Sequence, residues 1–148
     1  MSGQVATRSL IRMRKSASIQ EAARLMCDMS MGALGVDDDE HGFVGLITER
    51  DLMWAVAQGK DPLETRVKEI VNDFPIVVDA PISSEEAARR MISGHVRHLI
   101  IRDNDDLRIL SMRDLLTRFV NSPTAEGSTQ AASGKELHRM FGAAFVRK

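Results

Sequence analysis

Residues 18–26 read SIQEAARLM and residues 83–91 read SSEEAARRM, so one stretch of the chain recurs 65 positions later. Each copy leads to a quartet that begins with a hydroxyl residue and ends with aspartate, TERD at residues 48–51 and SMRD at residues 111–114. An internal repeat of this length indicates two copies of one supersecondary unit, neither of which buries its apolar face alone. We therefore expect two repeats, with function located between them.

The composition favours one compact domain made of two halves. The chain has 148 residues, of which 43% are hydrophobic, enough for a packed core. Its 20 basic and 21 acidic residues leave a net charge of −1, so no basic field attracts nucleic acid or an anionic membrane. A single cysteine fits a reducing compartment, and no apolar run approaches the ~20 residues that span a bilayer. We expect a cytoplasmic protein without a nucleic acid or membrane partner.

Both copies predict the order helix, hairpin, helix. In the first, apolar residues at helical spacing and a capping-box pair, Ser18 with Glu21, predict a helix from about Ser18 to Met29. Two short apolar runs then predict a hairpin, and the quartet begins a second helix that ends at Gln58, before a glycine. The corresponding elements of the second copy are a strand at 76–78, a helix from Ser83, strands at 98–101 and 107–110, and a helix at 112–120.

The predicted fold class is α/β (α+β), a tandem pair of repeats in which each small sheet packs with two helices. A Ser, Thr, Gly and Ala-rich stretch follows the second repeat and predicts a flexible linker. Beyond it, a third capping-box pair and one apolar helical face predict a tail helix. The predicted boundaries are repeat 1 at 5–58, a linker at 59–66, repeat 2 at 67–120, the flexible linker at 121–134 and the tail helix at 135–146.

Three motifs carry a resemblance to a known family. They are GLITERD at residues 45–51, LSMRD at residues 110–114 and HVRHL at residues 95–99. With them the chain, from about Val5 to Val120, resembles the CBS-domain family, named from cystathionine β-synthase, whose repeats occur in pairs called Bateman modules. The resemblance implies a pseudo-twofold pair whose strands meet in a sheet interface, with two clefts that in this family bind adenosine-containing ligands. It also implies a homodimer that forms a disc of four repeats.

The resemblance also assigns roles to the quartets. Asp51 and Asp114 would hold the ribose, because a carboxylate accepts both ribose hydroxyls in charge-assisted hydrogen bonds. Thr48 and Ser111 would meet phosphate or ribose oxygens at a helix N-terminus, which suits an anion. The apolar residues that would flank the base are Ile47 and Leu110.

Basic residues distinguish the two repeats. Arg97 and His98 match positions where similar modules place phosphate-binding residues, whereas the first copy has the uncharged Gly-Ala pair at 32–33. Arg108 stands where the first copy has Gly45, and it either adds a phosphate contact or obstructs its cleft. The resemblance therefore implies two unequal clefts, with one better nucleotide site.

Plainer interpretations stay open. Each quartet is also a complete helix cap without any ligand, and Arg97 with His98 is also compatible with a solvated rim. The basic run Arg12, Arg14 and Lys15 either reaches a phosphate or is a solvated edge. The acidic residues 37–40 lack a calcium-loop pattern, and the histidines lack zinc-ligand spacing, so we expect no metal site. The methionines expected in the core are Met26, Met29, Met31, Met53 and Met91.

The sequence thus predicts a regulatory, energy-sensing module that binds AMP, ADP, ATP or S-adenosylmethionine and acts on a separate, unknown protein in trans. No cofactor is required, and no catalytic residue is assigned, because no nucleophile elbow, P-loop, GxGxxG or zincin motif occurs. The alternative is a structural homodimerisation module with no nucleotide bound. A third, weaker interpretation is a small enzyme that turns over a nucleotide.

Overall fold

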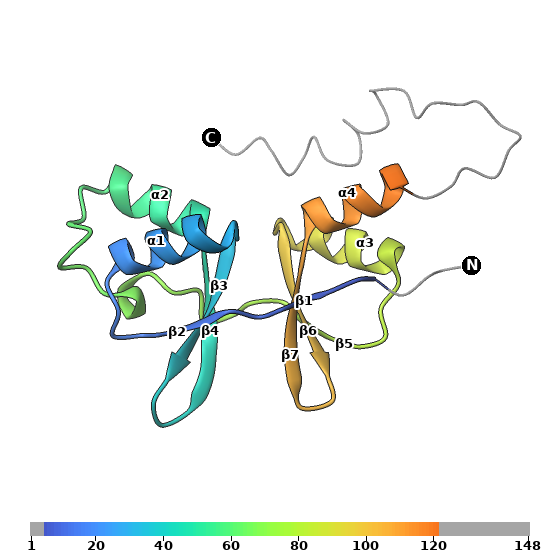
Figure 1. Ribbon diagram of the computed structural model, residues 1–148, viewed down its shortest axis with the longest axis horizontal. Coiled ribbons are helices and arrows are strands. Elements are labelled where there is room, and N and C mark those ends of the chain that lie inside the picture. Colours follow the sequence, from blue (N-terminus) through green and yellow to red (C-terminus); the bar gives the residue numbers. More distant parts are fainter. Residues whose placement is uncertain (1–4, 122–148) are drawn as a thin grey trace, which may run out of the picture. The chain divides into compact units, whose positions relative to one another are not determined.

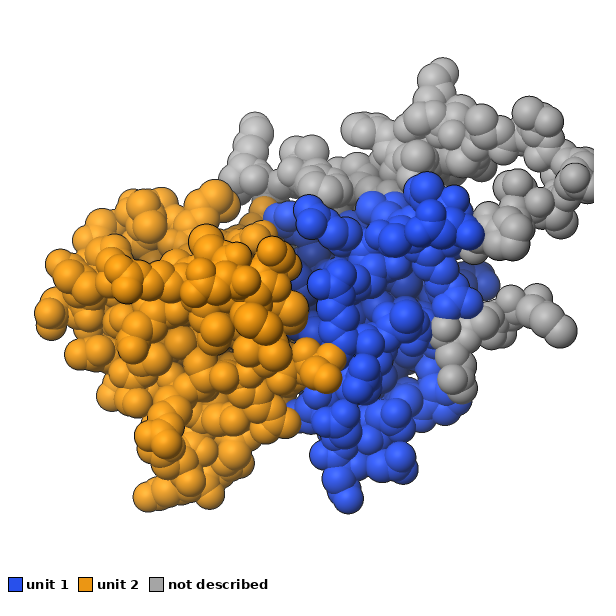
Figure 2. Space-filling model, viewed as in Figure 1, with its two compact units in different colours: residues 1–8, 76–148 blue, residues 9–75 orange. Residues whose placement is uncertain are grey.

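The computed structural model describes residues 5–121, which form two compact units (Figures 1 and 2). The first-repeat unit consists of residues 9–75, and the second-repeat unit consists of residues 1–8 and 76–148. The predicted flexible linker, apart from Asn121, and the predicted tail helix lie outside the described residues.

The first-repeat unit contains a three-stranded sheet of order β2–β3–β4. Strand β2 is parallel to β3, and β3 is antiparallel to β4, so the predicted hairpin is confirmed. Helix α1 contacts β3 and α2, and both helices lie at one end of the hairpin, whose turn extends away from them (Figure 1). The elements are β2 (Arg12–Arg14), α1 (Ile19–Met29), β3 (Ala33–Asp38), β4 (Gly42–Thr48), α2 (Glu49–Ala57) and a 3-10 turn (Val67–Glu69).

Helix α1 begins where the capping box predicts. The backbone N–H of Glu21 donates to Ser18 Oγ at 3.2 Å, and the N–H of Ser18 donates to Glu21 Oε2 at 2.7 Å. These bonds satisfy two of the four donors that a helix start leaves open. The apolar stripe that follows is buried at Ile19, Ala22 and Met26. Capping and periodicity together therefore fix the position of this helix on its sheet.

The second-repeat unit repeats this arrangement with one more strand. Its sheet has the order β1–β7–β6–β5, in which β5 is parallel to β6 and β6 is antiparallel to β7. The added edge strand β1 comes from the N-terminal segment and lies beside β7. The elements are β1 (Arg8–Ser9), β5 (Val77–Asp79), α3 (Ser84–Gly94), β6 (His98–Asp103), β7 (Asp106–Ser111) and α4 (Met112–Asn121).

Each unit has its own hydrophobic core, and the cores do not follow the predicted repeat boundaries. Val67, predicted at the start of repeat 2, is fully buried in the core of the first-repeat unit. The N-terminal residues up to Arg8, predicted in repeat 1, belong to the second-repeat unit. The first core consists of Ala22, Met26, Leu34, Val36, Ile47 and Val67. The second consists of Ile82, Ala87, Ala88, Met91, Leu99, Ile101, Leu110, Met112 and Leu115.

Of the five methionines predicted in the core, Met26 and Met91 are buried and Met31 is half-buried, whereas the prediction is wrong for the other two. Met29 is 48% exposed and Met53 is 64% exposed, because these helix positions face away from the unit's own sheet. Among residues 5–121, no helix has the length and apolar character that a membrane crossing requires.

The basic and acidic runs of the first repeat pair with each other across β2 and β3. Arg12 forms an ion pair with Asp37 at 3.2 Å, Lys15 pairs with Asp38, and Arg14 lies 3.8 Å from Asp39. The Lys15 ammonium holds the pKa of Asp38 well below its usual range. The cations of this strand are therefore used within their own sheet, which favours the structural interpretation of the run.

Candidate functional site

The second quartet joins the end of β7 to the first turn of α4. Asp114 Oδ2 accepts from the backbone N–H of Ser111 at 2.9 Å and from its hydroxyl at 2.6 Å. In return, the N–H of Asp114 donates to Ser111 Oγ at 3.2 Å. The Asp114 side chain is 14% exposed. The quartet thus places a mostly buried carboxylate at the start of a helix.

The first quartet has the same geometry. Asp51 Oδ2 accepts from the N–H of Thr48 at 2.7 Å and from its hydroxyl at 3.0 Å. The N–H of Asp51 donates to Thr48 Oγ1 at 3.4 Å. Both quartets are therefore real capping boxes, as the plainer interpretation expects. In both, however, these bonds use only Oδ2 of the aspartate, so the cap leaves Oδ1 for another partner.

In the second-repeat unit that partner is Arg8, which the sequence did not single out. Its Nη2 lies 2.9 Å from Asp114 Oδ1, and its side chain is 54% exposed. The two residues line a pocket of about 490 Å³. The remaining lining residues are Ala6, Thr7, Thr117, Arg118 and Asn121. The pocket thus combines a carboxylate with two arginines, a charge pattern that suits a ligand with both hydroxyl and anionic groups.

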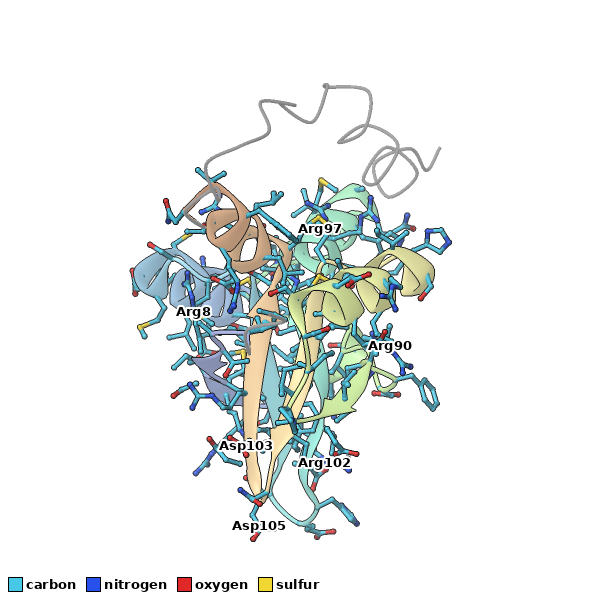
Figure 3. All side chains as sticks on the ribbon, turned by 90° about the vertical axis from the view of Figure 1, so that its right-hand side faces the viewer. Arg8, Arg90, Arg97, Arg102, Asp103 and Asp105 are labelled. Atoms are coloured by element: carbon cyan, nitrogen blue, oxygen red, sulfur yellow. The ribbon has the colours of Figure 1, made fainter. Side chains whose placement is uncertain are left out.

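Arg97 and His98 lie beside the same helix start. His98 is the cross-strand neighbour of Ser111, and the carbonyl of Arg97 accepts from the N–H of Met112 at 2.8 Å. Figure 3 shows Arg97 at the end of the unit where the helices lie, whereas Asp103 and Asp105 lie around the opposite tip of the β6–β7 hairpin. The backbone therefore brings both predicted basic residues to the second quartet.

Arg108 has a different place. Its Nε donates to Thr7 Oγ1 at 2.6 Å, and its Nη2 donates to the Thr7 carbonyl at 2.8 Å. It lines a separate pocket of about 330 Å³, which does not include Asp114. The residues around it are Val5, Thr7, Ala80, Pro81, Ile82, Ile101 and Asp103. Arg108 thus links β7 to the N-terminal segment by hydrogen bonds. Its pocket contains none of the other predicted site residues.

Ile47 and Leu110, predicted to flank a base, are fully buried in the cores of their own units. They are neighbours of Leu34 and Leu99 on the paired strands. In this structure both side chains serve packing, and contact with a base stays a prediction.

The hairpin turn of the first repeat brings Asp38, Glu40 and His41 together, with ligand atoms within 4.8 Å of one another. Asp38 Oδ1 accepts from the N–H of Glu40 at 2.8 Å and lies 3.3 Å from His41 Nδ1. Its other oxygen pairs with Lys15. Since Asp38 is already engaged by a cation, we assign no metal to this turn.

Comparison with known proteins identifies the family. The family model for the CBS domain matches residues 3–58 and 67–121. The chain is 31% identical over 141 residues to the CBS domain-containing protein YhcV of Bacillus subtilis, a match that covers 93% of this chain and 95% of YhcV. It is 32% identical over 117 residues to the uncharacterized protein MK0525 of Methanopyrus kandleri, covering 77% of this chain and 60% of MK0525.

A solved structure shows the same fold. The CBS domain protein PAE2072 from Pyrobaculum aerophilum, complexed with AMP, has a TM-score of 0.66 and 25% sequence identity, and the match covers 78% of this chain and 94% of that one. Two repeats of the same α+β architecture, matched by the family model over both copies, complete the identification. The chain belongs to the CBS-domain family.

Proposed function

We propose that this protein is a regulatory module that binds an adenosine-containing ligand at the pocket beside Asp114 and acts on a separate protein in trans. The candidate ligands are AMP, ADP, ATP and S-adenosylmethionine. The observation that carries the proposal is the mostly buried Asp114 carboxylate, which lines a pocket of about 490 Å³ together with Arg8 and Arg118. The complex of PAE2072 with AMP supports this ligand class.

The chemistry of the pocket fits such a ligand. A carboxylate has about four acceptor positions, so Asp114 can keep its bonds to Ser111 and still accept from a ribose diol. Bonds of this kind are charge-assisted and are about twice as strong as neutral ones. The first turn of α4 adds partial positive charge, which favours a nearby phosphate.

Regulation requires that the ligand bind two states of the module unequally, because equal binding shifts no equilibrium. The partner would then respond to the state that the ligand favours. We assign no catalytic residue to the module, and the cytoplasmic location remains a prediction from the sequence.

A thermal-shift and calorimetric panel of the four candidate ligands tests the proposal. A ligand at about a hundred times its Kd should stabilise the protein by roughly 2.7 kcal/mol, which raises the Tm by several degrees. Asp114→Asn should lose this shift, because asparagine keeps an acceptor for the helix cap but removes the charge that holds the ribose. Asp79→Asn, an exposed change in the same unit, is the matched control.

The result would count against the proposal if no ligand in the panel raised the Tm, or if Asp114→Asn and Asp79→Asn responded equally. In that case the quartets act as helix caps alone, and the structural homodimerisation module would become the better interpretation.

The homodimer also belongs to the proposal, and exposed apolar residues on α2 and α4 support it. Met53 and Leu116 occupy equivalent positions in the two repeats, as do Val56 and Phe119. All four are exposed, with Val56 at 67% and Phe119 at 54%. Matching apolar positions on both helices are consistent with a self-complementary interface.

Placing a charge on each helix should separate the dimer. We expect Val56→Glu combined with Phe119→Glu to yield monomers in sedimentation measurements at micromolar concentration, because buried unpaired carboxylates are costly. Ser16→Glu combined with Ser93→Glu adds the same charge at exposed polar positions and should leave the dimer intact. A wild-type protein that sediments as a monomer would contradict this part of the proposal.

A further inference from the structure

The guanidinium of Arg8 holds the one oxygen of Asp114 that the helix cap leaves open. Asp114 Oδ2 is used by Ser111, and Oδ1 lies 2.9 Å from Arg8 Nη2. Because Oδ2 already accepts two bonds, a ribose diol that donates both hydroxyls to Asp114 needs both acceptor positions of Oδ1, and it must then displace Arg8. Because the Arg8 side chain is 54% exposed, water can solvate its guanidinium when it leaves Asp114, which limits the cost of opening the pair.

The first repeat has no counterpart of this arginine. Strand β1 lies beside β7, and in the first-repeat unit Asn72 exchanges two backbone hydrogen bonds with Leu46 of β4, at 3.0 and 2.9 Å. With the spacing of 65 residues that separates the repeats at this edge, Thr7 corresponds to Asn72 and Arg8 corresponds to Asp73. The position that carries a cation beside Asp114 is therefore acidic in the other repeat.

A second arginine of the pocket also has no basic counterpart in the first repeat. Arg118 lines the Asp114 pocket. Its equivalent in α2 is the fully buried Ala55, which lies 63 positions earlier, the same spacing that separates the two quartets. Arg8 and Arg118 therefore both lack a basic counterpart at the equivalent positions, Asp73 and Ala55. Both line the Asp114 pocket.

The consequence depends on what the ligand offers to the displaced arginine. A neutral nucleoside that occupied Asp114 would leave the Arg8 guanidinium without an anionic partner. A phosphate on the same ligand would provide a new anion, which arginine binds with two parallel hydrogen bonds. The exchange is then most favourable for a ligand that carries a phosphate.

We propose that Arg8 selects phosphorylated ligands at this site by exchanging the Asp114 carboxylate for the ligand's phosphate when ribose hydroxyls occupy Asp114. The inference rests on the proposed function and narrows its ligand class. S-adenosylmethionine has no phosphate, and its one carboxylate is accompanied by a sulfonium and an ammonium cation, so we expect it to bind more weakly than AMP.

Isothermal calorimetry on the full chain with AMP, adenosine and ribose 5-phosphate tests the exchange. Wild type should bind AMP roughly 10- to 100-fold more tightly than adenosine, the range of one or two charge-assisted hydrogen bonds. Arg8→Met should reduce this ratio at least about tenfold, because it removes the cation and keeps an apolar side chain of similar length. Arg102→Met is the matched control, since Arg102 is also 54% exposed and paired with an aspartate, Asp79, in the same unit.

The outcomes separate the two proposals. If AMP and adenosine bind in an Asp114-dependent manner but Arg8→Met leaves their ratio unchanged, the exchange is overturned and the proposed function stands. If ribose 5-phosphate binds as tightly as AMP and loses affinity in Arg8→Met, the phosphate exchange stands and the adenosine specificity fails. If none of the three probes binds to wild type, the exchange is overturned, and the proposed function then depends on ADP, ATP and S-adenosylmethionine in the thermal-shift panel.

Discussion

Replacing Gly45 with alanine should destabilise the first-repeat unit by roughly 3 kcal/mol, the sum expected for overpacking and the loss of backbone hydrogen bonds. A Cβ at this position would lie 2.3 Å from the carbonyl oxygen of Asn72 and 2.8 Å from Val71 Cγ2. To make room, the segment around Asn72 must leave β4, and its two hydrogen bonds with Leu46 break. The Tm measured by circular dichroism should fall by more than about 10 °C.

Gly94→Ala is a matched control for this prediction. There too a Cβ would approach a neighbour to 2.3 Å, but the neighbour is Ile76 Cδ1, the far end of a flexible side chain. We expect a change within about 1 kcal/mol, because alanine also favours the helix in which Gly94 lies. Equal losses of stability in the two variants would contradict the claim that the backbone of Asn72 requires Gly45.

A fragment of residues 9–75 should unfold cooperatively on heating, whereas a fragment of residues 1–58 should not. The longer fragment retains the complete first core, including Val67, and the hydrogen bonds from Ile19 N to the Thr65 carbonyl and from Val67 N to the Ala17 carbonyl. The shorter fragment follows the sequence repeat and loses these contacts. Units of this size bury only a modest share of their surface, so one missing core segment is decisive.

Thermal melts followed by far-ultraviolet circular dichroism, which reports the loss of helices α1 and α2, compare the two fragments. A 1–58 fragment that melts as sharply and at as high a temperature as 9–75 would show that residues 59–75 are dispensable. Proton spectra of the same samples provide a second measure of order, since a packed core disperses methyl resonances.

The sequence predicts what depends on local chemistry. Ser18 and Thr48 begin their helices as expected, because a capping box is complete within four residues. The hairpin strands follow from apolar runs bounded by turn residues. The second quartet likewise begins α4 where the repeat pattern places it, with His98 paired to Ser111, whereas ligand contact by Arg97 and His98 stays a prediction.

What the sequence does not predict depends on pairing between distant segments. Arg8 lies in a strand of two residues, too short for any periodicity, and meets Asp114 only because β1 lies beside β7. The one available signal was the contrast between Arg8 and Asp73 at equivalent positions. Similarly, Arg108 is equivalent to Gly45, but its bonds to Thr7 follow from tertiary structure.

The N-terminal segment up to Arg8 belongs to the second-repeat unit, and this has a consequence during synthesis on the ribosome. All of the first-repeat unit lies between residues 9 and 75, so its strands can assemble while the rest is still being translated. The N-terminal segment cannot pair until β7 has been synthesised, since Thr7 and Arg108 are 101 positions apart. At roughly 5–20 residues per second, that edge strand stays unpaired on the nascent chain for about 5–20 s, long enough for a chaperone to bind it.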